Sequence, residues 1–522
     1  MPWGIFFVMK KILSLFILTT LSMIALSQTY FNERYNYSLP ASLDFCKGIF
    51  IGGDYYIIPG AHTYLDNLNF NFISLMKLDS IGYPILVKNY GDTIHSYSIN
   101  NTQGAFKEVS NGSFYSVGTK REYTNDWVHD VGLIYKFNSD LDTLWTKSIG
   151  DIQTPYDTNY LFHHFDLLQN NELVIIGEIV VEGTQGIAFL IKTDSLGNEL
   201  WRQYYPLVPH SKGINVVQTP DGGFALSCFN WSFQGINSSN FLIKTDSLGN
   251  EQWRREIGGP YSDDPLFIVN SPDNTIMGAY THSDSVALPS SDSFNRDAVI
   301  KYDLDGNLIW EKIHGESLLN KWVKSANINE DGKLILSGIK YKDGGDYHYY
   351  RIGYLLNCNN NGDSLWYREY ELLKEYPSGN YLEGVSPTND GGYIAVGDVL
   401  PWPPDTGNQD VWVIKVDSLG CESWDICWVG EKEHIALREA EQLKIFPNPA
   451  NYELNIFVPK ENENEKHYLL IYDLYGRKVE ETVIPPGTTT LQLSVSGWSS
   501  GLYTAISSYN GKISGRGKFV VR

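Results

Sequence analysis

The chain repeats one phrase, which reads Phe189-Leu190-Ile191-Lys192-Thr193-Asp194-Ser195-Leu196-Gly197-Asn198-Glu199-Leu200-Trp201. A close copy runs from Phe241 to Trp253, and in both copies Trp follows Asp by seven residues. The same offset occurs at five further places: Asp79 to Leu86, Asn138 to Trp145, Asp303 to Trp310, Asn359 to Trp366 and Asp417 to Trp424. The seven copies lie 52 to 59 residues apart, which indicates a repeat architecture.

A second phrase, built around a glycine-rich turn, precedes each copy of the first. Its clearest forms are Thr219-Pro-Asp-Gly-Gly-Phe224 and Thr388-Asn-Asp-Gly-Gly-Tyr393. Weaker forms stand at five places: 52–58, 111–118, 170–177, 273–277 and 330–338. This phrase also occurs seven times, so the repeat unit contains both phrases.

Each unit is predicted to form four short strands. In the unit around Asp221 they cover 214–218, 224–229, 241–244 and 251–256, which are β-branched and aromatic runs separated by Gly, Asn and Asp. Asp-Gly-Gly and Asp-Ser-Leu-Gly-Asn are typical of hairpin turns, because Gly and Asn accept positive φ. The pattern predicts an all-β fold with a seven-bladed β-propeller. A β-solenoid is the alternative, although its repeats are usually shorter.

The recurrent Trp is interpreted as a structural residue. A large aromatic side chain at one position of every blade would fill the wedge between neighbouring blades. The phrase is similar to the tryptophan-docking repeat of quinoprotein-like propellers, with a shorter spacing, and also resembles the Asp-box of sialidases, with different Gly and Trp offsets. A cofactor role for these rings is the less favoured interpretation, and no cofactor is expected. The predicted docking residues are Trp145, Trp201, Trp253, Trp310, Trp366 and Trp424.

The loop lengths predict two different propeller faces. With strands A to D in chain order, the A–B and C–D turns are short, and we call their end of the propeller the turn face. Length variation falls in the B–C and D–A connections, whose end we call the loop face, and function usually resides in such loops. The possible ligand residues there are Trp127, Trp231, Tyr261, Tyr349 and Trp402. Also expected on the loop face are Tyr123, His129, Asp130, Tyr160, His163, His164, Asp263 and Asp264. Packing of the loops against each other is the competing interpretation.

Composition excludes one class of partner. The 522 residues carry a formal net charge of -21, which is unsuited to the phosphate backbone of nucleic acid. Aromatic residues reach 14%, so the chain can bury a large core and is not globally disordered. We therefore expect a folded protein with no nucleic-acid partner.

The N-terminus predicts export. Lys10 and Lys11 precede an apolar run, and Ala25 and Ser27 stand at the small-residue positions of a cleavage site. Residues 1–27 are therefore predicted to be a signal peptide, and an N-terminal membrane anchor is the alternative. No later stretch is long and apolar enough to span a bilayer, so no transmembrane segment is expected after cleavage.

Five cysteines suit an oxidising compartment. Cys421 and Cys427 flank Trp424 at close spacing and are the preferred disulfide pair. Cys228 and Cys358 lie in apolar runs and are expected to be buried thiols. We find no paired Cys/His clusters that would suit zinc, so no metal site is predicted.

The repetition stops near Trp428, and a separate C-terminal module follows. The predicted propeller covers residues 28–430, and the charged stretch 431–443 is predicted to be a linker. Alternating apolar residues at Leu454, Ile456 and Val458, and again from Leu491 to Val495, indicate short strands. The module, residues 444–522, is predicted to be a small immunoglobulin-like β-sandwich.

Four ordered motifs in this module resemble the type A C-terminal sorting domain of type IX secretion cargo in Bacteroidota. They are Pro447-Asn448-Pro449, Asp473-Leu-Tyr-Gly476, Gly501-Leu-Tyr503 and the terminal Lys518-Phe-Val-Val. The resemblance implies transport through the periplasm to the outer cell surface or the medium. It also implies two partners, the type IX machinery and a surface protease that removes the domain near the linker. The motif residues would be recognised as a folded surface.

An activity of the propeller would be indicated by catalytic and metal-binding motifs in its sequence. No Gly-x-Ser-x-Gly, His-Glu-x-x-His or P-loop motif is present. Asn357-x-Asn359-x-Asn361-Gly362 imitates the start of a calcium loop, but Arg368 stands where a bidentate Glu is required. We expect a binding or interaction module for a surface glycan or protein. The alternatives are a surface enzyme acting on carbohydrate and a purely structural surface protein.

Overall fold

The computed structural model describes residues 30–522 apart from internal gaps. The gaps are 38–41, 47, 65–69, 100–105, 110–111, 124–127, 151–157, 182–184, 209, 231–237, 260, 262, 285–294, 316–320, 342–349, 375–377, 402–407, 423–440, 459–466, 474–477 and 510–511. The predicted signal peptide lies outside the described residues. Within them, no helix is of a length and apolarity that would let it cross a bilayer.

The chain divides into two compact units, Met1–Glu422 and Ser423–Arg522. The division falls ahead of the predicted propeller boundary at residue 430. The predicted linker lies almost entirely within residues that the structure does not describe. Each unit is described by itself below.

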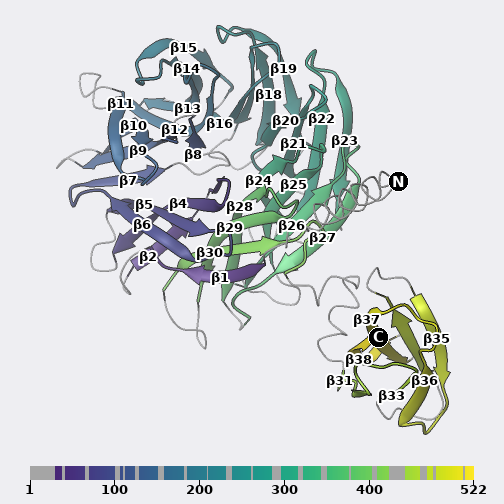
Figure 1. Ribbon diagram of the computed structural model, residues 1–522. Helices are drawn as coiled ribbons and strands as arrows, with labels where there is room; N and C mark the ends of the chain where they lie inside the picture. The colour runs from purple at the N-terminus through teal and green to yellow at the C-terminus, as the bar shows by residue number, and fades with distance from the viewer. Residues whose placement is uncertain are drawn as a thin grey trace, which may run out of the picture. The chain divides into compact units, whose positions relative to one another are not determined.

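The first unit consists of seven antiparallel blades around a central axis (Figure 1). Blade 1 contains β2 (Ser42–Cys46), β3 (Phe50–Ile51), β4 (Tyr55–Tyr64), β5 (Asn71–Asp79) and β6 (Pro84–Tyr90). Blade 2 contains β7 (His95–Ile99), β8 (Phe106–Glu108), β9 (Phe114–Tyr123), β10 (Val128–Phe137) and β11 (Thr143–Ile149). Blade 3 contains β12 (Thr158–Leu167), β13 (Leu173–Val181), β14 (Ile187–Thr193) and β15 (Glu199–Tyr205).

Blades 4 to 6 each contain four strands in simple succession. Blade 4 contains β16 (Ser211–Gln218), β17 (Phe224–Asn230), β18 (Ser239–Thr245) and β19 (Glu251–Ile257). Blade 5 contains β20 (Phe267–Asn270), β21 (Ile276–Ser283), β22 (Asn295–Tyr302) and β23 (Leu308–His314). Blade 6 contains β24 (Lys321–Ile328), β25 (Leu334–Tyr341), β26 (Arg351–Cys358) and β27 (Ser364–Tyr370). The blade 4 strands contain all four predicted ranges, so the predicted strand order and turn positions are confirmed there.

Blade 7 is assembled from both ends of the unit. Three of its strands are consecutive, namely β28 (Gly379–Pro387), β29 (Tyr393–Leu400) and β30 (Asp410–Val416), and the fourth is β1 (Phe31–Tyr35). Strand β1 pairs antiparallel with β30 over its whole length, and the two lie side by side in Figure 1. The first and last described parts of this unit therefore close the ring together.

The core of the propeller lies between the blades. Seven clusters of buried residues lie between the blades, one at every blade interface. Six of them draw on two neighbouring blades, and the cluster between blades 5 and 6 also includes Ile214 of blade 4. In the cluster between blades 2 and 3, Tyr115 and Ile134 pack with Phe162 and Phe189. The sheet of each blade is apolar on both faces, and both faces must be shielded from water. In the ring, the two neighbouring blades cover them.

The innermost strands carry β-bulges that explain one glycine of the second phrase. The pairing of β12 with β13 shifts between Phe162 and His164, and equivalent shifts occur in β16, β24 and β28. A Cβ atom on Gly177 would lie 2.0 Å from the carbonyl oxygen of Leu161. Only glycine fits there, because the bulge pushes that carbonyl against the neighbouring strand.

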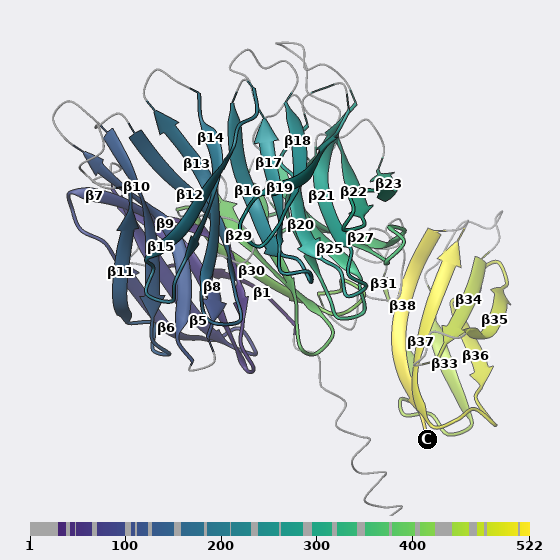
Figure 2. The same cartoon turned by 90° about the horizontal axis from the view of Figure 1, so that it is seen from above.

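The second unit contains two sheets. The larger sheet has five strands in the order β31 (Glu441–Gln442), β38 (Lys512–Val521), β37 (Gly501–Tyr509), β34 (His467–Tyr472) and β35 (Lys478–Ile484) (Figure 2). The smaller sheet has three strands in the order β32 (Ile445–Phe446), β33 (Glu453–Phe457) and β36 (Thr490–Ser494). One buried cluster joins them, with Leu454 and Leu493 from the smaller sheet and Leu469 and Phe519 from the larger. The predicted small β-sandwich is confirmed.

Candidate functional site

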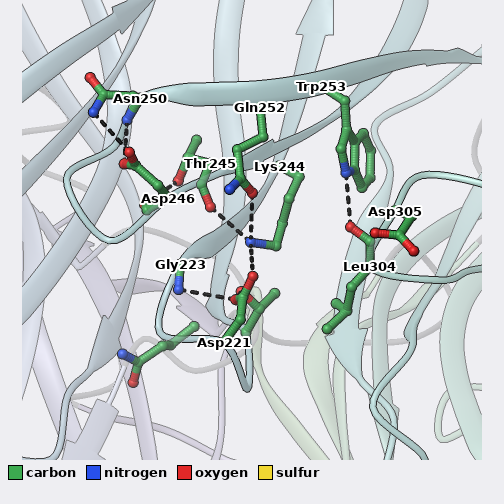
Figure 3. Close-up of polar contacts among 12 residues, drawn as sticks. Asp221, Gly223, Lys244, Thr245, Asp246, Asn250, Gln252, Trp253, Leu304 and Asp305 are labelled. Atoms are coloured by element: carbon green, nitrogen blue, oxygen red, sulfur yellow. Dashed lines mark hydrogen bonds and ion pairs between the residues drawn. The ribbon is translucent and has the colours of Figure 1, made fainter.

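The C–D turn of each blade satisfies its own polar groups. In blade 4, Oδ1 of Asp246 accepts hydrogen bonds from the backbone N–H groups of Leu248 and Asn250, both at 2.9 Å. The contacts between Asp246 and Asn250 are drawn in Figure 3. The side chain of Asn250 donates to Oδ2 at 2.9 Å, and this hydrogen bond is the main cause that lowers the pKa of Asp246. The same backbone pattern recurs at Asp79, Asn138, Asp194, Asp303, Asn359 and Asp417. Asn359, in the calcium-like stretch, therefore caps a turn.

An ion pair joins the two repeated phrases within a blade. Lys244 is fully buried, and its Nζ lies 2.8 Å from Oδ2 of Asp221, which belongs to the A–B turn (Figure 3). Equivalent pairs are Lys192–Glu172, Lys301–Asp273 and Lys415–Asp390. In blades 1 and 2 the lysine instead lies over a tyrosine ring, Lys77 over Tyr55 and Lys136 over Tyr115. The Lys and Asp of the repeat thus serve packing within the blade.

Four of the predicted docking Trp residues cover the C–D turn of the next blade. Nε1 of Trp253 donates to the carbonyl oxygen of Leu304 at 2.9 Å (Figure 3), and a Cβ atom on Gly306 would lie 2.8 Å from the Trp253 ring. The rings of Trp201, Trp310 and Trp366 lie equally close to Gly249, Gly362 and Gly420. Trp145 packs on Tyr115, with ring centroids 5.9 Å apart.

In blade 7 the corresponding position is held by Phe31. Trp201 and Trp253 pair in register with Lys192 and Lys244, and Phe31 pairs in the same way with Lys415. A Cβ atom on Gly82, in the C–D turn of blade 1, would lie 2.8 Å from the Phe31 ring. Trp424, the predicted residue of the seventh copy, lies outside the described residues. Sequence reasoning missed Phe31 because it stands far from the seventh copy of the phrase.

Most of the predicted ligand residues cannot be placed. Trp127, Trp231, Tyr349 and Trp402 lie outside the described residues, and Tyr261 is half-buried. Of the further residues expected on the loop face, Tyr123 is 41% exposed. His129, Asp130, Tyr160, His164 and Asp263 are buried. His164 lies at the channel instead, and Asp130 binds the guanidinium of Arg121. Four of these five residues lie in strands β10 and β12, which extend further than the sequence pattern predicted, and only Asp263 lies in a connection.

An arginine surrounded by aromatic rings lies at the loop face of blades 6 and 7. The guanidinium carbon of Arg351 lies 5.8 Å from the ring centroid of Trp322 and 5.4 Å from those of Tyr341 and Tyr381. Its Nη2 donates to the Tyr341 hydroxyl at 3.4 Å, and its Nε is buried without a hydrogen-bond partner. All four side chains are half-buried, and among the described residues no carboxylate pairs with Arg351. We call these residues the Arg351 cluster. They come from four strands, so no local motif identified them.

Two groups of titratable side chains include residues of the D–A connections. Glu178 accepts hydrogen bonds from His163 at 3.2 Å and from His210 at 2.9 Å. Burial opposes ionisation of Glu178, but these hydrogen bonds outweigh it and hold its pKa well below its usual range. Burial raises the pKa values of Asp263 and Asp264, and the charge of Lys324 only partly offsets it at Asp264. No group of three or more His, Cys, Asp or Glu within the described part of the chain is arranged to hold a metal ion.

A channel of about 420 Å³ runs between the innermost strands. All seven blades contribute to its wall, near the ends of their inner strands that lead into the A–B turns. One residue per blade forms a ring at this level, in the order Phe50, Lys107, Asp166, Val217, Val269, Asn327 and Ser386. The ring contains two hydrogen-bonded pairs, Lys107 with Asp166 at 3.0 Å and Asn327 with Ser386 at 2.9 Å, separated by apolar side chains.

The cysteines follow the expected division in part. Cys46, Cys228 and Cys358 are buried free thiols, and burial raises the pKa of each. Cys421 is disulfide-bonded. Its predicted partner Cys427 lies outside the described residues.

In the second unit the sorting motifs divide between surface and core. Four motif residues are exposed, namely Pro447, Asn448, Pro449 and Lys518. The Asn448 side chain contacts strand β38: it donates to the Lys518 carbonyl oxygen at 3.2 Å and accepts from the Val520 N–H at 2.9 Å. Tyr503 is buried and stacks on Phe519 with ring centroids 5.6 Å apart. The other motif residues are less informative: Gly501 pairs with Val521, Asp473 follows β34, and Gly476 lies outside the described residues.

One family matches the second unit. The family described as "Secretion system C-terminal sorting domain" matches residues 444–522. This confirms a type IX secretion sorting domain behind a β-propeller, and it implies secretion or cell-surface localisation and interaction with the type IX machinery. No curated protein matches the chain.

Solved structures resemble the propeller weakly. The β-propeller domain of the Trilobed protease from Pyrococcus furiosus has 10% identity and a TM-score of 0.39, and the match covers 71% of this chain and 93% of that one. The α-L-arabinanase of Penicillium chrysogenum, complexed with arabinobiose, has 13% identity and a TM-score of 0.39, with 60% and 92% covered. Similarity this weak indicates nothing about the activity of this chain.

Proposed function

We propose that the exported propeller is a binding module whose loop face takes a surface ligand, either a glycan or a protein. The Arg351 cluster is the observation that carries this proposal. Its three rings and its guanidinium are half-buried at the loop face, and no carboxylate among the described residues neutralises the charge. Aromatic rings and arginine are the side chains most often responsible for binding energy at recognition surfaces.

The difference between the two faces supports the same assignment. On the turn face, the Asp and Asn side chains of the C–D turns are used by the turn itself, and the acids of the A–B turns bind buried lysines. On the loop face, the residues of the Arg351 cluster lie at or near the strand ends that lead into the B–C and D–A connections, and these connections vary in length. A rigid scaffold with variable loops at one end is the usual arrangement of a binding protein.

A binding screen tests the proposal. Mature protein is applied to arrays of glycans and peptides, and each hit is measured again with Arg351→Met and Trp322→Ala. We expect at least a tenfold loss of affinity in both variants, because each removes part of the cluster. Leu248→Ala, an exposed change on the turn face, is the control and should bind normally. A hit that is insensitive to both cluster variants contradicts the assignment.

A surface enzyme acting on carbohydrate is the second candidate. It is favoured by Asp264, because a carboxyl group whose pKa is raised by burial can act as a general acid. The same arrays are therefore assayed for hydrolysis. Product formation that is lost in Asp264→Asn would favour the enzyme, whereas binding without hydrolysis favours the binding module.

Removal of the sorting domain is the finer proposal for export. We propose that a surface protease cuts within residues 431–443, and that Pro447, Asn448, Pro449 and Lys518 form the surface that the machinery recognises. A chain ending at residue 443 should remain in the periplasm. Surface display of that chain would contradict the sorting role.

A further inference from the structure

We infer that the channel near the turn face binds a small, neutral, polyhydroxylated molecule. This site is independent of the proposed loop-face site, because its residues lie on the inner strands beside the A–B turns. Its volume of about 420 Å³ falls within the range of small-molecule sites, roughly 300–1,000 Å³.

The polar groups of the channel keep hydrogen-bonding capacity that the protein does not use. Among the described residues, Lys107 has one side-chain partner, Asp166, for its three N–H donors. The amide nitrogen of Asn215 and the hydroxyl hydrogen of Ser386 have no acceptor among the described residues. Together with Asp166, these groups come from four blades and line one cavity, so a ligand inside it would meet hydrogen-bonding groups on several sides.

The charge of the channel favours a neutral ligand. Lys107 and Asp166 neutralise each other at 3.0 Å. The other polar side chains of the lining are His164, whose Nδ1 accepts from the Val216 N–H at 3.3 Å, three asparagine amides and the Ser386 hydroxyl. A carboxylate or phosphate would approach Asp166, and an ammonium group would approach Lys107, at short range. A hydroxyl group can donate to Asp166 and accept from Lys107, Asn215 or Ser386.

The apolar part of the wall suits the carbon face of such a molecule. Phe50, Val217 and Val269 separate the two hydrogen-bonded pairs of the ring. A polyol or sugar ring presents C–H groups between its hydroxyls, and these can pack on an aromatic or aliphatic side chain. The alternation of polar pairs and apolar residues therefore matches a molecule with both kinds of surface.

Saturation-transfer NMR with mature full-length protein tests this inference. The probes are glycerol, arabinose, galactose and myo-inositol, with glucuronate as the charged comparison. Val217→Phe fills the channel without removing a polar partner, and Ser386→Ala removes one donor. We expect a neutral probe to bind, and its affinity to fall at least fivefold in both variants. Melting temperatures verify that each variant is folded, and Ser386→Ala decides the matter if Val217→Phe does not fold.

Trp322→Ala separates this site from the proposed loop-face site. Neutral-probe binding that persists in Trp322→Ala and weakens in the channel variants supports the channel site, whether or not the array screen finds a ligand. Three results overturn it: no neutral probe binds, which leaves water as the only occupant; binding is unchanged in the channel variants; or glucuronate binds more tightly than the neutral probes.

Discussion

Lys244 has no exposed surface, and Asp221 reaches it from a turn in which its own side chain is 45% exposed. The two residues belong to different phrases of the repeat, and the structure explains why the phrases recur together. Where the turn has no acid in the matching place, as in blade 2, the lysine lies over a tyrosine ring instead. The sequence contained both residues of each pair, but their spacing did not reveal that they touch.

Removal of the acid should therefore cost more than an exposed ion pair is worth. Within the described part of the chain, Asp221→Ala leaves the buried ammonium with the Thr245 carbonyl and the Gln252 side chain as its remaining partners. We expect a loss of about 2–3 kcal/mol in the free energy of unfolding. Asp363→Ala is the matched control, because its partner Lys312 is 35% exposed, and it should change little. Urea denaturation measures both. Equal effects would contradict the structural role of the buried pair.

Two glycines with the same backbone conformation separate turn strain from ring packing. Gly222 and Gly249 have φ of 82° and 78°, so alanine is strained at both. A Cβ atom at Gly222 would meet nothing within 4 Å, whereas at Gly249 it would lie 2.8 Å from the Trp201 ring. We expect Gly222→Ala to cost about 1 kcal/mol and Gly249→Ala about 1–3 kcal/mol more. Equal melting temperatures of the two variants would show that close packing of the Trp201 ring on Gly249 does not contribute to stability.

At the scale of the element, strand β1 has the clearest consequence. Its Tyr35 hydroxyl donates to the carbonyl oxygen of Gly82 at 2.6 Å, as Tyr205 does to Gly249 and Tyr370 to Gly420 in other blades. The N-terminal strand thus reproduces a D strand in register, packing and hydrogen bonding. The repeat alone predicted that residues after Asp417 would take this place.

Deletion of residues 28–36 should open the ring. The edge of β30 and the cluster between blades 7 and 1 would be exposed, and we expect the melting temperature to fall by on the order of 10 °C. A synthetic peptide of residues 28–37 should restore it, and the same peptide with Phe31→Ala should do so less well. Deletion of residues 28–29 alone is the control. An unchanged melting temperature in the longer deletion would mean that β1 does not close the ring.

At the scale of the whole molecule, the turn carboxylates give the propeller a pH dependence. Burial opposes ionisation of Asp221, Asp273 and Asp390, but their lysine partners outweigh it, so the pKa of each carboxyl is lowered in the folded chain. A lowered folded pKa contributes stability above the unfolded pKa, near 4, and this contribution is lost as the pH falls through the folded pKa.

We therefore expect stability to be nearly constant from pH 7 to pH 5 and to fall below about pH 4. Urea denaturation followed by Trp fluorescence measures it. Asp273→Asn should make the decline shallower, because one of the depressed carboxyls is removed. A steeper decline in that variant would contradict the assignment.

The sequence alone determined the features that depend on neighbouring residues. Hairpin turns, strand alternation, the number of repeats and the motifs of the sorting domain are all local, because a turn or a strand is specified within about ten residues. The asymmetry between short turns and long connections was predictable for the same reason.

Only the tertiary structure decided the features that join distant parts of the chain. Strand β1 closes blade 7 from about 380 residues away, Phe31 takes the docking position, and the Arg351 cluster and the channel ring each combine side chains from separate strands or blades. Such contacts depend on how the seven blades close around one axis. A repeat specifies each blade separately, but the closure of the ring selects which residues meet.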